Sequence, residues 1–250
     1  MEFEKKGISV KVTPFIFAAY NISAIVVSPF TDVIIAKIGR RQTLLLGLLS
    51  EGVGYLLLGF GASIDHKATY IGLAITARIF AGFGGNCVMI TFYAIVLNFY
   101  TVNQTRALVY SETAWSVGIM LGPGVGTILF WIGGYNFMIF FFGGSLIFVA
   151  ISFQFLLPAC LDLQTGSGEG QSEEREDANQ VSKMELVKHP NYLFALIAMG
   201  VETIALNFYL TLLSLRLIHT FGLSEYVTGL YFLIQPAAAI LAAMTITVRI

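Results

Sequence analysis

The chain has 250 residues, of which 56% are hydrophobic and 12% are charged, and its formal net charge is −1. A soluble domain has about twice this share of charged residues, and a nearly neutral chain offers no basic surface to a polyanion. The composition therefore excludes a soluble enzyme, a nucleic-acid-binding domain and a disordered chain, and it predicts a polytopic membrane protein.

Seven stretches of the chain are long and apolar enough to cross a bilayer as helices, which takes about 20 residues each. They cover residues 12–36, 43–62, 71–98, 107–131, 134–157, 191–215 and 226–248. The predicted fold class is all-α, a polytopic transmembrane helix bundle. Short loops make consecutive helices antiparallel neighbours.

One connection differs from these short loops. Residues 161–190 are polar, acidic and rich in Gly and Ser, which predicts a disordered linker. It separates an N-terminal bundle of five spans, residues 1–160, from the start of a second bundle with two spans, residues 191–250. Loops on one side hold seven Lys and Arg against five on the other, which favours a cytosolic location for the loop 37–42 and for the linker.

The turn after the first span contains Gly39, Arg40 and Arg41. Glycine permits a tight turn, and two arginines at the lipid headgroup level can clamp helix ends or carboxylates during a conformational change. The alternative interpretation is a simple cytosolic anchor of positive charge.

Arg78 lies inside the third apolar stretch and is followed by Gly82, Gly84 and Gly85. A charge in hydrocarbon is costly, so Arg78 is expected to face a cavity or a partner, while the glycines allow close helix contact. The alternative is an arginine that extends its side chain to the interface.

Gly118, Gly122 and Gly126 recur every four residues in the fourth stretch, and Pro123 follows the second of them. This spacing places the glycines on one helix face, and the proline removes a backbone donor and bends the helix. Such a helix suits a moving interface between two bundles. The alternative is a static packing stripe.

These three features, in this order, resemble signatures of the major facilitator superfamily. The Gly39–Arg41 turn is similar to its signature between helices two and three, Arg78 with Gly82 to its helix-four signature, and Gly118–Gly126 to its helix-five signature, which marks the drug and amine antiporter branch. Within that branch Ser28-Pro29-Phe30, the position of Glu112 and the lead-in EKKGIS resemble vesicular amine and polyamine transporters.

The resemblance implies a partial major-facilitator fold in which the seven spans correspond to family helices two to eight, and the first family helix is missing. Two positions depart from the signatures. The acidic residue of the first signature falls on Ala36, with Asp32 one turn earlier on the same face, and a usually small residue after the glycines falls on Asn86.

Four acidic residues lie inside predicted spans, where an ionisable group is a functional candidate by default. Glu202, in the middle of its span, is the strongest candidate for binding a substrate cation or a proton, with a hydrogen-bonded packing role as the alternative. Glu112 is a further candidate for proton coupling, or else an interfacial partner of Arg106. Asp32 is a third candidate, although pairing with the arginines of the nearby turn is favoured. Glu51 receives no role from the sequence.

The resemblance implies a secondary active transporter, not an enzyme, that exchanges protons for an organic cation (an amine, polyamine or drug-like molecule) by alternating access. Arg78 would couple protonation to gating. No cofactor or metal is expected, since Cys87 and Cys160 lie far apart and form no metal motif. The expected partners are protons, a small cationic substrate and the lipid bilayer of a vesicle, another endomembrane or the plasma membrane. Two alternatives stay open: a membrane sensor, and a truncated protein that acts as an assembly subunit.

The sequon-like triplet Asn103-Gln104-Thr105 tests the orientation. In the favoured orientation it faces the cytosol, so the protein expressed in a glycosylating cell is expected to show no mobility shift after glycosidase treatment. A glycan on Asn103 would invert the topology.

Overall fold

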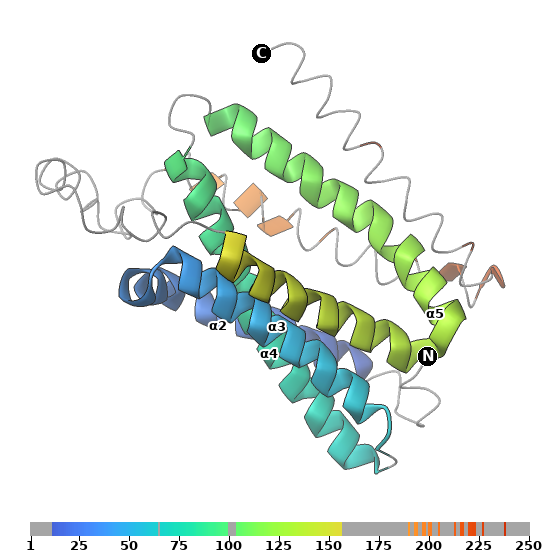
Figure 1. Ribbon diagram of the computed structural model, residues 1–250. Coiled ribbons are helices and arrows are strands. Elements are labelled where there is room, and N and C mark those ends of the chain that lie inside the picture. The colour runs from blue at the N-terminus through green and yellow to red at the C-terminus, as the bar shows by residue number, and fades with distance from the viewer. Residues whose placement is uncertain are drawn as a thin grey trace, which may run out of the picture.

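The computed structural model describes residues 12–64, 66–99 and 104–156, together with isolated positions between 190 and 238. Its helices are α2 (Thr13–Ile38), α3 (Arg40–Gly61), α4 (Lys67–Phe99) and α5 (Gln104–Leu156). All four are long and apolar enough to cross a membrane. The predicted all-α bundle is confirmed for these residues (Figure 1). The predicted linker up to residue 189, Glu202 and most of the last two predicted spans lie outside the described residues.

Large apolar side chains cover the outside of the helices. Phe15, Trp131 and Phe155 are 75%, 87% and 84% exposed, and many other large apolar residues are more than two-fifths exposed. A soluble protein does not leave such continuous apolar surface in water. The described helices therefore present to their surroundings the surface that lipid hydrocarbon requires.

The turn between α2 and α3 is shorter than the predicted loop 37–42. Helix α2 continues to Ile38 and α3 begins at Arg40, so Gly39 alone joins them. Its φ of 86° lies in the region that glycine adopts without strain, which lets the chain reverse within one residue. Its amide donates to the carbonyl of Ile35 (2.9 Å) and its carbonyl accepts from the amide of Thr43 (3.1 Å).

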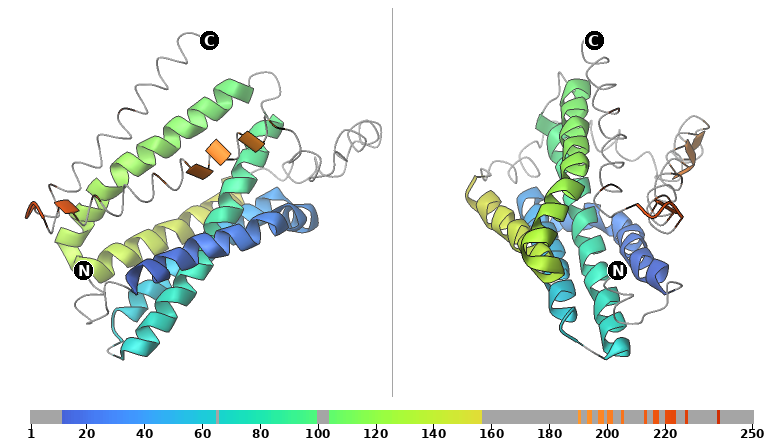
Figure 2. Two further views of the ribbon diagram at one scale, coloured as in Figure 1. Left: turned by 180° about the vertical axis from the view of Figure 1, so that it is seen from behind. Right: turned by 90° about the vertical axis from the view of Figure 1, so that its right-hand side faces the viewer.

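Helix α5 contains both the fourth and the fifth predicted spans. Gly134 has φ 72° and ψ −169°, values outside the helical region, and it divides α5 into two legs. Figures 1 and 2 show the ribbon reversing direction there, so that the second leg runs back beside α3 while the first leg extends away from α2. The boundary predicted between residues 131 and 134 thus coincides with a real reversal of the chain.

Helix α4 occupies the centre of the bundle, with α2 against one side and α3 against the other, while α2 and α3 touch each other little. Glycine makes these contacts close. A Cβ at Gly82 would meet the main-chain oxygen of Tyr20 on α2, and one at Gly84 would meet the main-chain oxygen of Gly47 and, at 2.5 Å, the amide nitrogen of Glu51 on α3. Close backbone approach at small residues is the usual packing of membrane helices.

The second leg of α5 packs on the opposite side of α3 by the same means. A Cβ at Gly52 would lie 3.1 Å from the main-chain oxygen of Gly143, and one at Gly59 would lie 3.1 Å from the ring of Phe140. Helix α3 is therefore held between α4 and α5.

The seam between α3 and α4 can be tested with two substitutions on α4. We expect Gly84→Ala to lower the free energy of unfolding by about 1–3 kcal/mol, because the new methyl group meets backbone atoms that cannot rotate away. Gly72→Ala, on the same helix with nothing within 4 Å, should leave stability unchanged or slightly higher. Thermal unfolding in detergent measures both, and equal midpoints for the two variants would contradict this packing.

Candidate functional site

Arg78 lies inside the bundle, about three turns after the start of α4. Its guanidinium carbon is 4.5 Å from the centroid of the Phe17 ring on α2, and its buried Nε has no hydrogen-bond partner among the described residues. A guanidinium over an aromatic face gains a cation–π attraction that is strongest where water is excluded. The structure thus holds a positive charge at membrane depth against an apolar ring.

Glu51 on α3 reaches the same region of the bundle. The position that a Cβ would take at Gly85 lies 2.6 Å from the Tyr20 hydroxyl and 3.8 Å from Oε1 of Glu51. Tyr20 on α2 and Tyr55 on α3 both lie within electrostatic range of Glu51 and of Arg78. We call Phe17, Tyr20, Glu51, Tyr55 and Arg78 the Arg78 cluster.

Helical periodicity explains why these side chains lie on the facing sides of their helices. Phe17 and Tyr20 are three residues apart on α2, and Glu51 and Tyr55 are four apart on α3, so each pair shares a helix face. Arg78 and Gly85 are seven residues apart on α4, about two turns, and also share a face. The Arg78 cluster therefore lies where the facing sides of three helices converge.

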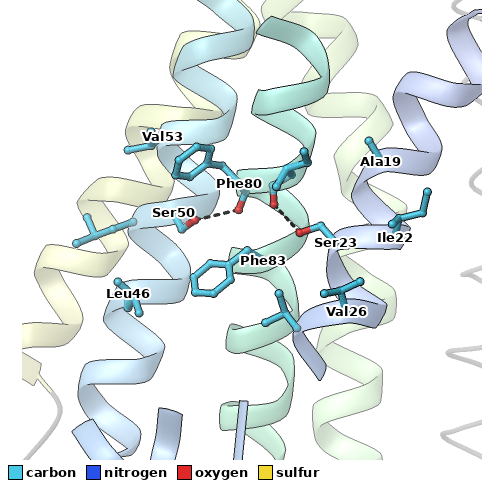
Figure 3. A pocket seen from close by; sticks show the side chains of 12 residues that line it. Ala19, Ile22, Ser23, Val26, Leu46, Ser50, Val53, Phe80 and Phe83 are labelled. Atoms are coloured by element: carbon cyan, nitrogen blue, oxygen red, sulfur yellow. Dashed lines mark hydrogen bonds between the residues drawn. The ribbon is translucent and has the colours of Figure 1, made fainter. Parts of the chain in front are cut away.

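An open groove of about 730 Å³ lies between α2 and α3, with α4 as its floor (Figure 3). The rings of Phe80 and Phe83 project into it from α4. The two hydroxyls in its lining are already used, because Ser23 donates to the carbonyl of Ile79 (2.9 Å) and Ser50 donates to that of Phe80 (3.0 Å). The groove consequently offers a ligand only apolar surface. Its full lining is Ala19, Ile22, Ser23, Val26, Val27, Leu46, Leu49, Ser50, Val53, Ile79, Phe80 and Phe83.

The groove and the Arg78 cluster lie on opposite faces of α4. Phe83 and Gly85 are two residues apart, so their Cα–Cβ directions differ by about 200° around the helix. Phe83 lines the groove, whereas Gly85 adjoins Tyr20 and Glu51. Charge and hydrogen-bonding capacity are thus concentrated on one side of α4, and an apolar surface lies on the other.

Asn86 joins α4 to α2. Its Nδ2 donates to Oγ1 of the fully buried Thr31 (3.1 Å), which itself donates to the Val27 carbonyl (3.2 Å). The sequence marked Asn86 only as a departure from a signature, and the structure shows it making a hydrogen bond between helices. Cys87, next in the chain, is buried and has a free thiol.

The two arginines of the turn lie in the first turn of α3. Arg41 donates from Nη2 to the main-chain oxygen of Gln154, near the end of α5, where helix carbonyls have no partner within the helix. Within the described part of the chain, the buried Nε and Nη1 of Arg40 have no hydrogen-bond partner. The sequence expected these arginines to clamp helix ends or carboxylates, and Arg41 does contact a helix end.

The other acidic candidates lie apart from the Arg78 cluster. Glu112 is exposed on the first leg of α5 and accepts a hydrogen bond from the hydroxyl of Tyr93 on α4. Asp32 is exposed on α2. Glu202, the strongest candidate of the sequence, lies outside the described residues.

The glycine stripe of the first leg of α5 has almost no neighbours among the described residues. A Cβ at Gly118 or Gly122 would find nothing within 4 Å, and one at Gly126 would approach only Sδ of Met138, at 3.8 Å. Helical backbone continues through Pro123, and the reversal of the chain occurs at Gly134 instead. The role of this stripe at a moving interface stays a prediction, with static packing as the alternative.

Sequence reasoning found Arg78 but missed the side chains around it. Glu51 carried one usable signal, since it is the single acidic residue of α3, flanked by small residues at the centre of an apolar run. Tyr20 and Tyr55 carried none, because tyrosines are common in membrane helices. Among the described residues no group of three or more His, Cys, Asp or Glu side chains is placed to hold a metal ion.

Comparison with known proteins gives a consistent result. Residues 3–249 match the family described as Major Facilitator Superfamily. The chain is 28% identical over 211 residues to Multidrug resistance protein 2 of Bacillus subtilis, covering 83% of this chain and 50% of that protein. It is 22% identical over 233 residues to the mouse MFS-type transporter SLC18B1, covering 93% of this chain and 48% of that protein. The chain spans about half the length of these curated relatives. No solved structure matches it.

The Asn86 contact generates a prediction about stability. Thr31→Val leaves the Asn86 amide without its acceptor and is expected to lower the free energy of unfolding by about 1 kcal/mol, since hydrogen bonds between membrane helices are individually modest. Thr76→Val is the matched control, because Thr76 is exposed and donates only within its own helix. Chemical unfolding in mixed micelles compares them, and a larger loss for Thr76→Val would refute this role of Asn86.

Proposed function

This chain belongs to the major facilitator superfamily, and we propose that the protein is a secondary active transporter that exchanges protons for an organic cation by alternating access. The superfamily consists of transporters, so no catalytic activity is proposed. The substrate class, the coupling ion and the activity of the whole protein are all part of this proposal.

One observation carries the proposal: Arg78 is kept inside a membrane-spanning helix, within electrostatic range of tyrosines that also face a carboxyl group. A fixed cation at membrane depth is costly and is retained where it acts on a mobile charge. When a proton or a cation arrives, the charge balance around Arg78 changes, and that change can bias one arrangement of the helices over another.

The roles proposed for the other candidate residues are those inferred from the sequence. Glu202 supplies a counter-charge for the substrate, while Glu112 and Asp32 are further carboxyls for proton coupling. The turn of Gly39, Arg40 and Arg41 acts in gating. Gly82 does so too, as does the helix that carries Gly118, Gly122, Pro123 and Gly126. The contact of Arg41 with the end of α5 supports the gating role, because a change in that contact would couple the turn to a second helix.

Similarity supports the substrate class in part. Two relatives are named multidrug resistance proteins, which favours a drug-like organic molecule, and a third is named an MFS-type transporter. The amine or polyamine assignment depends on the local sequence resemblance. The same resemblance favours a vesicular or other endomembrane, with the plasma membrane as the alternative.

Transport is tested with the full protein in proteoliposomes that carry an acidic lumen. We expect accumulation of labelled amines or of ethidium, a fluorescent organic cation, and loss of the accumulation when a protonophore is added. Arg78→Ala should lower the initial rate at least tenfold, because the fixed charge is removed. Lys67→Ala, a cation at the exposed start of the same helix, should retain the rate.

Absence of gradient-dependent accumulation for every probe would overturn proton-coupled antiport. Wild-type rates in Arg78→Ala would remove Arg78 from the mechanism while leaving transport in place.

A further inference from the structure

Glu51 lies at the midpoint of α3, which runs from Arg40 to Gly61. At about 1.5 Å per residue it is some 16 Å from either end of the helix, the middle of a hydrocarbon layer about 30 Å thick. Binding sites of secondary transporters lie near this depth. Glu51 is thus the described carboxyl with the most central place in its helix.

Two tyrosines lie within electrostatic range of Glu51, Tyr20 from α2 and Tyr55 from α3 itself, and both are also within range of Arg78 on α4. No hydrogen bond or ion pair joins the Glu51 carboxyl to another described side chain, although its Oε1 lies near the Tyr20 hydroxyl. Among the described residues this largely buried carboxyl therefore has no pairing partner.

Gly85 preserves the space between the Tyr20 hydroxyl and the Glu51 carboxyl. A methyl group there would lie 2.6 Å from the hydroxyl oxygen, inside van der Waals contact. A carboxyl oxygen and a phenol oxygen approach this position together, and both are acceptors for the N–H groups of an ammonium ion. Arg78 lies on the Phe17 ring rather than in an ion pair with Glu51, so the carboxyl is left for another cation.

A charged carboxylate without a partner at this depth is strongly disfavoured, so a proton or another cation must neutralise it. We propose that Glu51 is the carboxyl at which a proton and the ammonium group of the transported cation exchange, with the hydroxyls of Tyr20 and Tyr55 as further ligands. This inference rests on the proposed function and adds the residue at which coupling occurs.

The exchange conserves charge and atoms. The O–H bond of the protonated carboxyl breaks, the proton leaves to the aqueous phase, and the ammonium ion takes its place beside the carboxylate. The site carries the same net charge before and after. No covalent bond to the substrate forms, and proton and cation exclude each other because both need the same oxygen atoms.

Binding and proton release are measured on the full protein in weakly buffered detergent, with ethidium as the probe. For the wild type we expect affinity to fall as the pH falls, since protons compete for Glu51, and ethidium binding to release up to one proton per bound cation. Glu51→Gln should bind at least tenfold more weakly, with affinity independent of pH and without proton release. Tyr20→Phe should weaken binding but keep the proton release.

Two controls separate this role from a structural one. Glu51→Asp keeps the carboxyl and is expected to restore part of the proton release. Ser50→Ala changes the neighbouring residue, whose hydroxyl faces the groove side of α4, and should behave as wild type.

If Glu51→Gln retains the pH dependence and the proton release of the wild type, the inference is overturned while transport itself stands. If the wild type transports no probe under a proton gradient, the proposed function fails first.

Discussion

Close contact between helix backbones, made possible by glycine, holds helix α4 between α2 and α3. The rest of the described arrangement depends on that contact. At Gly82 and Gly84 the main chains of neighbouring helices come as close as a missing side chain allows. Lipid provides no hydrophobic driving force between apolar helices, so the association depends on close packing and a few hydrogen bonds. Larger residues at these positions would separate the helices and, with them, the side chains that they carry.

The same contact gives α4 two different faces. Helices α2 and α3 flank α4 and touch each other little, and an open groove lies between them on one side of α4. On one side Phe80 and Phe83 form an apolar floor whose neighbouring serines are bonded to main-chain oxygens. On the other side Tyr20 and Tyr55 lie within electrostatic range of both Arg78 and Glu51. The apolar groove therefore offers no ligand to an ion, whereas the charged and hydroxyl groups of the Arg78 cluster lie on the other side of α4.

Much of the fold was predictable, because the local composition of a segment is enough to identify a membrane-spanning helix. The first three spans were placed within a few residues of their helices, and the reversal at Gly134 separates the next two. The turn at Gly39 was placed correctly but expected to be longer, since composition does not show that one residue with positive φ can reverse the chain. The candidate site was predictable only for Arg78, whose charge is conspicuous in an apolar run.

The sequence by itself determined the class of protein, the helices and the superfamily, because length, apolar runs and spaced glycines are local properties of the chain. The tertiary structure decided which side chains act together. Glu51 and Tyr20 are far apart in the chain and belong to no sequence motif. Both nevertheless approach the position that a side chain at Gly85 would occupy. In the sequence Asn86 is only a departure from a signature, whereas in the structure its hydrogen bond to Thr31 connects α4 to α2. Such contacts depend on how helices are rotated and how closely they approach, and neither is encoded in a single segment.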